Sequence, residues 1–164
     1  MTEPEKKLAL DRYLELTGLF DDIQGMPAAI VQFRPEPNMW TIQEHLVHVM
    51  EAEVAVFHRY RKAIAEPGGP VIGFDQDRFT PALDYHGTTI AEALGIIKLL
   101  RTIAYRQLLG IITQDWQNYY YEHNETGSVN LETFLMKYNE HMLAHREYVD
   151  RNLRLFERRS SAGN

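Results

Sequence analysis

Residues 40–53 read WTIQEHLVHVMEAE, and this stretch predicts the start of a long helix. Thr41 and Glu44 fit a capping box, in which the Thr41 hydroxyl accepts from the Glu44 backbone N–H while the Glu44 side chain reaches back. Trp40 precedes the cap, where its ring can pack against residue 45 as a staple. Apolar residues then recur at helical spacing until the segment Pro67–Pro70 ends the helix after about residue 65.

Three further helices are predicted around this one. The first covers residues 4–24, another begins at a second capping box and covers residues 89–113, and the last covers residues 130–158. Glycine and proline gather in residues 68–87, which predicts a long loop, and residues 117–128 form a polar, Tyr-rich connection. No strand pattern of useful length is present. The expected fold is all-α, an antiparallel four-helix bundle with a long crossover loop between helices two and three.

The length fits one domain. The chain has 164 residues, of which 45% are hydrophobic and 24% charged, a balance typical of folded proteins. We expect a single domain over residues 1–159, followed by a disordered tail over residues 160–164, which are small and polar.

The absence of cysteine restricts the chemistry. The sequence contains no Cys and 7 His. Disulfides, thiolate ligands, a Cys nucleophile and an iron–sulfur cluster are therefore excluded, and a transition metal would have to be held by His, Asp or Glu.

Charge and hydropathy argue against two classes of partner. The net charge is −6, whereas non-specific nucleic-acid binding needs an excess of Lys and Arg. The basic cluster of Arg151, Arg154, Arg158 and Arg159 is interpreted as a solvated helix end that faces the negative end of the helix dipole. No segment reaches the roughly 18 apolar residues of a membrane span, and no secretory signal is recognisable. We expect a cytoplasmic protein that binds neither nucleic acid nor membrane.

Four of the histidines form two pairs. His45 and His48 lie three residues apart on the second predicted helix, and His141 and His145 lie four residues apart on the last. Spacing of four residues puts two imidazoles on one helix face, and a helical wheel places His141 and His145 on the apolar face. Spacing does not choose between His45 and His48 as a third ligand.

The sequence resembles the DinB-like (damage-inducible) four-helix-bundle superfamily of metal-dependent enzymes. The family pattern W-[ST]-x-x-E-x-x-x-H-L-x-D-x-E is similar to residues 40–53, and an H-x-x-x-H motif on the last helix matches His141 and His145. The resemblance implies that His48, His141 and His145 bind one divalent metal ion, zinc or nickel, and that His45 is the staple partner of Trp40. This chain departs from the pattern at Val49, at Glu51 and at Arg146, none of which removes a ligand.

Three histidines leave an open coordination position, which is typical of a catalytic metal site. The resemblance implies an enzyme that uses a low-molecular-weight thiol cosubstrate as an S-transferase, or a hydrolase, acting on a small-molecule substrate. We also expect that two copies of the chain can form a homodimer. The alternative is a non-catalytic stress-response or binding module with a weak or vacant metal site. Glu51, Glu53 and Tyr138 are candidates to orient the ligands, with Glu53 expected to be paired or near a cavity. No catalytic residue is assigned, and His58, His86 and His123 are expected to be exposed.

Overall fold

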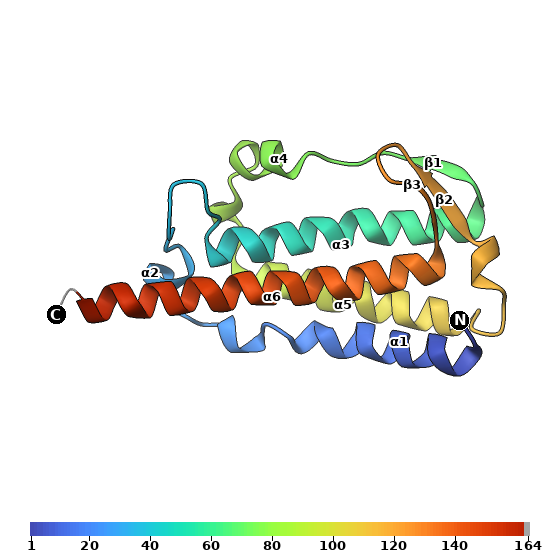
Figure 1. Ribbon diagram of the computed structural model, residues 1–164, viewed down its shortest axis with the longest axis horizontal. Coiled ribbons are helices and arrows are strands. Elements are labelled where there is room, and N and C mark those ends of the chain that lie inside the picture. The colour runs from blue at the N-terminus through green and yellow to red at the C-terminus, as the bar shows by residue number, and fades with distance from the viewer. Residues whose placement is uncertain (163–164) are drawn as a thin grey trace.

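Four long helices lie side by side in the computed structural model, which describes residues 1–162 (Figure 1). They are α1 (Glu3–Glu15), α3 (Ile42–Ala65), α5 (Ile90–Leu109) and α6 (Leu131–Ala162). The connections add two short helices, α2 (Ala28–Val31) and α4 (Gln76–Ala82), and 3₁₀ turns at Leu16–Gly18, Asp21–Ile23, Tyr85–Gly87 and Trp116–Asn118. The four-helix prediction is therefore confirmed in its main outline.

Both predicted capping boxes are confirmed. The Thr41 hydroxyl accepts from the Glu44 backbone N–H at 3.1 Å, and the Thr89 hydroxyl accepts from the Glu92 backbone N–H at 3.2 Å. In each box the glutamate carboxylate accepts from the backbone N–H of its threonine at 2.8 Å. The helices α3 and α5 therefore begin where the sequence predicts, because their start signals are local.

The C-terminal ends of the first and last helices differ from the prediction. The first helix ends at Glu15, and the chain continues in two 3₁₀ turns, with Gly18 weakening further helical structure. The last helix continues to Ala162, so the tail expected from residue 160 is helical as far as it is described, and residues 163–164 lie outside the described part. Ser160 and Ser161 hydroxyls donate to the carbonyls four residues earlier, at 3.0 and 2.9 Å, which suits a helical position.

A small sheet corrects the all-α expectation. Its strands are β1 (Gly69–Val71), β2 (Tyr120–His123) and β3 (Gly127–Asn130). β1 pairs with β2 in parallel, with Gly69 opposite Tyr121, and β2 pairs with β3 as a hairpin. The strands are only three or four residues long, and they draw on both segments that the sequence assigned to loops.

The sheet defines one end of the bundle and shows how the helices run. α3 and α5 each lead into a strand of this sheet, whereas α6 starts from it, and the N-terminal amine of Met1 contacts Glu132 there at 2.6 Å. α3 and α5 therefore run in the same direction, opposite to α1 and α6 (Figure 1). The bundle is thus not antiparallel throughout. Residues 72–89 pass from β1 back to the first turn of α3, where the His86 carbonyl accepts from Gln43 at 3.1 Å.

The core has two apolar parts separated by a polar layer. One part, with Tyr60 and Trp116, lies near the sheet, and the other, with Phe20 and Ile42, lies near the opposite end. Glu53 and Arg101 are buried and paired with each other at 2.6 Å, which places an ion pair inside the bundle. None of the helices described here combines the length and apolar character needed to cross a membrane.

Candidate metal centre

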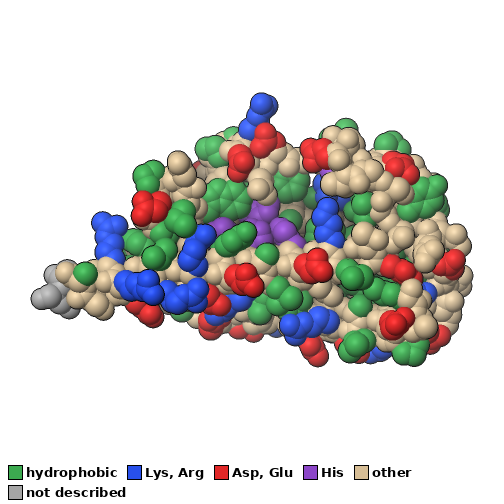
Figure 2. Space-filling model, in the orientation of Figure 1, with side chains coloured by type: hydrophobic (Ala, Val, Ile, Leu, Met, Phe, Trp, Pro, Cys, Tyr) green, Lys and Arg blue, Asp and Glu red, His purple; other side chains and the backbone are tan. Residues whose placement is uncertain are grey.

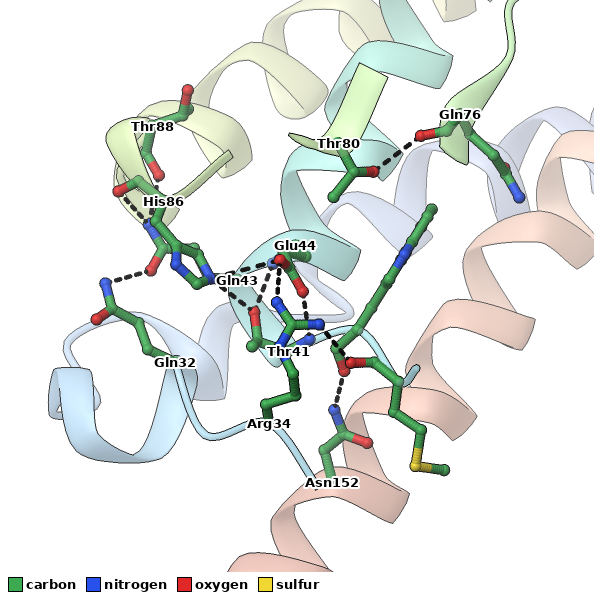
Figure 3. Close-up of polar contacts among 12 residues, drawn as sticks. Gln32, Arg34, Thr41, Gln43, Glu44, Gln76, Thr80, His86, Thr88 and Asn152 are labelled. Atoms are coloured by element: carbon green, nitrogen blue, oxygen red, sulfur yellow. Dashed lines mark hydrogen bonds and ion pairs between the residues drawn. The ribbon is translucent and has the colours of Figure 1, made fainter. Parts of the chain in front are cut away.

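A polar network fixes the start of α3 against its neighbours (Figure 3). The Glu44 carboxylate accepts from Arg34 at 2.5 Å, and Thr41 contacts the His86 ring at 3.1 Å. Asn152 of α6 donates to the carbonyl of Trp40 at 2.7 Å. This last bond ties α6 to the residue before the cap. The first two turns of α3, which carry the histidine pair, are therefore held at a set position beside α6.

The structure brings His48, His141 and His145 together. Each offers one ring nitrogen, and these three atoms lie within 4.8 Å of one another. The Nε2 atoms of His48 and His141 are 3.3 Å apart. Two nitrogens bound at about 2.0–2.1 Å to a tetrahedral zinc ion would be separated by about 3.3–3.4 Å. The His48–His141 pair therefore has the spacing of two zinc ligands, and His145 lies close enough to be a candidate for the third.

Burial keeps these histidines neutral. It lowers the pKa of His48 and of His141 to about 4, and it lowers the pKa of His145 to about 2, with the neighbouring histidines adding to the effect. A neutral imidazole carries a lone pair on one ring nitrogen, which is the form that binds a metal ion. The three side chains are therefore in the ligating form at neutral pH.

His45 supports the cluster rather than lying apart from it. Its ring lies 5.4 Å from that of Trp40, in agreement with the expected staple, and it stacks on Tyr148 at 5.2 Å. Its Nδ1 also lies 3.2 Å from Nδ1 of His145. This contact, which spacing did not reveal, leaves Nε2 of His145 as the ring nitrogen that could bind a metal ion. The Nδ1 atoms of His48 and His141 have no hydrogen-bond partner in the described part of the chain.

We expect the His45→Phe variant to bind zinc about 10–100-fold more weakly than the parent protein, the usual cost of losing a group that orients a ligand. Phenylalanine keeps a ring between Trp40 and Tyr148 but removes the contact to His145. The measurement is competition with a chromophoric chelator, alongside thermal unfolding of the metal-free protein. An unchanged zinc affinity with an intact fold would show that His45 does not orient His145.

Two cavities adjoin the cluster. The larger, of about 540 Å³, is lined by Trp40, Tyr148 and Arg151 together with His141 and His145. The smaller, of about 180 Å³, is lined by His48 and His141 on the side toward the sheet. Gln76 of α4 lines both, so the segment between α3 and α5 covers the cluster from outside. In Figure 2 the histidines gather in a hollow on this face of the molecule.

The candidates for orienting the ligands have other roles. Glu53 is paired, as expected, but with Arg101 at 2.6 Å and with the Tyr13 hydroxyl at 3.0 Å. The Tyr138 hydroxyl accepts from Arg59 at 3.1 Å, and Glu51 makes no hydrogen bond to the histidines in the described structure. Arg146, a departure from the family pattern, pairs with Asp22 at 2.5 Å.

Of the remaining histidines, two are exposed and one is buried. His58 and His86 are exposed, as expected. The prediction that His123 is exposed is wrong, because its strand pairs with β1 and its side chain is buried beside the smaller cavity. Trp116 and Tyr121 are core residues, and neither lines the two cavities next to the cluster.

Comparison with known proteins agrees with this architecture. YfiT from Bacillus subtilis, described as a probable metal-dependent hydrolase with an unusual four-helix bundle topology, superimposes with a TM-score of 0.85. The match covers 94% of this chain and 89% of that one at 15% sequence identity, so it shows a shared fold. No curated protein matches the sequence. The DinB superfamily, however, matches residues 12–149, most of the chain. The chain therefore belongs to the DinB superfamily.

Proposed function

We propose that the protein is a divalent-metal-dependent enzyme whose metal is held by His48, His141 and His145. The observation that carries this proposal is the convergence of three neutral imidazoles within 4.8 Å, next to open cavities. A divalent cation supplies Lewis-acid chemistry, which polarises a carbonyl or phosphoryl group and makes water or a thiol more acidic. Zinc and nickel are among the ions that suit imidazole ligands without thiolate.

The reaction we propose first is hydrolysis, and the description of YfiT as a probable metal-dependent hydrolase supports it. The second candidate is transfer to a low-molecular-weight thiol. It rests on the resemblance to the DinB-like superfamily, and the sulfur would then arrive with a cosubstrate because the chain contains no cysteine. The substrate is a small molecule in both cases. The cytoplasmic location and the homodimer stay predictions from the sequence.

An activity screen tests the proposal. Untagged protein would be stripped of metal, reloaded with zinc or nickel, and assayed with ester and amide substrates and with an electrophile in the presence or absence of a thiol. A hydrolase forms product without thiol, whereas a transferase requires it. We expect turnover only in the metal-loaded protein, and none in the His141→Ala variant. Equal rates with and without metal would contradict the proposal, and bound metal without turnover would favour the non-catalytic binding module.

A further inference from the structure

Arg59 is a buried cation without a counter-ion. Its side chain is 8% exposed, and no carboxylate of the described residues lies within ion-pairing distance of it. The guanidinium donates to the Tyr138 hydroxyl at 3.1 Å and to the Ile72 carbonyl at 3.2 Å. A guanidinium has five N–H donors, so these two bonds leave most of its capacity unused. A buried charge of this kind is costly unless something pairs with it.

The smaller cavity gathers further donors around Arg59. His123 is 9% exposed, and its Nδ1 accepts from the Glu125 backbone N–H at 3.2 Å. In a neutral imidazole the proton is then on Nε2, which becomes a donor. Lys137 also lines the cavity and makes no ion pair with any described residue. Figure 2 shows Lys and Arg side chains next to the histidines at the edge of the hollow.

The charge balance of this cavity is positive. Glu125 is the one carboxylate that lines it, and it pairs with neither Arg59 nor Lys137. Two cations against one carboxylate suit a ligand with a single negative charge better than a dianion. The cavity, at about 180 Å³, has room for a group several times the size of a water molecule.

We propose that this cavity binds a carboxylate group of the substrate, held by Arg59, Lys137 and His123 beside His48 and His141. Arg pairs well with carboxylates because two parallel N–H groups match the two oxygens. As a statement about the substrate, this inference rests on the proposed function. The cavity itself is built from side chains outside the metal cluster, so its affinity for a carboxylate can be measured without metal.

The test is an NMR titration of the metal-free, ¹⁵N-labelled protein with acetate. We expect saturable shifts at the backbone amides of Gly73 and Glu125, and no such shifts with acetamide, the neutral analogue. Arg59→Gln is expected to weaken acetate binding about tenfold, which corresponds to the loss of a charge-assisted hydrogen bond. Lys137→Ala, at an exposed position, tests the same site without disturbing the core.

Arg151→Gln is the matched control, because it removes a positive charge from the larger cavity. We expect it to leave acetate binding unchanged. Absence of saturation, equal shifts with acetamide, or an equal loss in Arg151→Gln would overturn the proposal. Tighter binding of inorganic phosphate than of acetate would overturn the carboxylate assignment.

Arg59 also joins α3 to the chain at Ile72. The thermal stability of the Arg59→Gln variant is therefore measured alongside its acetate affinity. If the Arg59→Gln variant is unfolded, the Lys137→Ala variant alone tests the site. An unchanged acetate affinity in Lys137→Ala would then overturn the proposal. A protein that binds acetate in this way but takes up no metal would contradict the proposed function and leave the carboxylate site standing. Failure of the carboxylate site and failure of the proposed metal-dependent function are therefore distinguishable.

Discussion

Replacing His141 by Ala is expected to lower the affinity for zinc by more than about 100-fold. Loss of a residue that only orients a ligand costs about 10–100-fold, and loss of the ligand itself costs more. The Nε2 atom of His141 lies 3.3 Å from that of His48, so the variant retains only two of the three clustered imidazoles. The side chain of His141 is only partly buried, so its removal should leave the fold intact.

The measurement is the zinc dissociation constant by chelator competition, with the zinc-induced rise in melting temperature as a second readout. A ligand at 100 times its dissociation constant stabilises the folded state by about 2.7 kcal/mol, and this gain should disappear in the variant. His58→Ala is the matched control, because His58 is an exposed histidine outside the cluster. Equal zinc affinity in His141→Ala and His58→Ala would remove His141 from the site.

Replacing Glu53 by Gln is expected to lower the free energy of unfolding by about 3–5 kcal/mol, as is usual when one partner of a buried ion pair is removed. Arg101 is fully buried and donates to Glu53 Oε1 through Nε at 2.8 Å and through Nη2 at 2.6 Å. It also donates to the carbonyls of Tyr13 at 3.1 Å and Tyr138 at 2.9 Å. These residues come from α1, α3, α5 and α6, so the pair joins all four long helices.

The measurement is urea unfolding of the metal-free protein. Glu66→Gln is the control, because its ion pair with Lys62 is at the surface and should contribute less than about 1 kcal/mol. A double variant, Glu53→Gln with Arg101→Met, should recover part of the loss, since no uncompensated cation remains. A loss below about 1 kcal/mol in Glu53→Gln alone would show that the pair does not hold the helices together.

Local signals in the sequence predicted the helix starts well. A capping box is complete within four residues, and both predicted boxes, Thr41 with Glu44 and Thr89 with Glu92, are present. The sheet could not be predicted in the same way, because its register joins Gly69 to Tyr121 across the length of α5. The shared direction of α3 and α5 depends on the same distant pairing.

The candidate site was predictable in part. Helical spacing placed His141 and His145 on one face, and the family resemblance chose His48 over His45. The structure groups His48 with them, and it adds the contact of His45 with His145 at 3.2 Å. That contact joins α3 to α6, so it depends on how the helices pack. The unpaired charge of Arg59 could not be predicted either, because its contacts with Ile72 and Tyr138 depend on how distant segments of the chain pack.

The most direct test of the metal site is the metal content of untagged protein purified without chelators, followed by calorimetric titration of the stripped protein with zinc and nickel. If His48, His141 and His145 form the site, we expect about one divalent ion per chain, and stoichiometric rebinding after stripping. X-ray absorption should report nitrogen ligands and no protein sulfur, since the chain has no cysteine. Protein without metal, and without measurable affinity for either ion, would contradict the account.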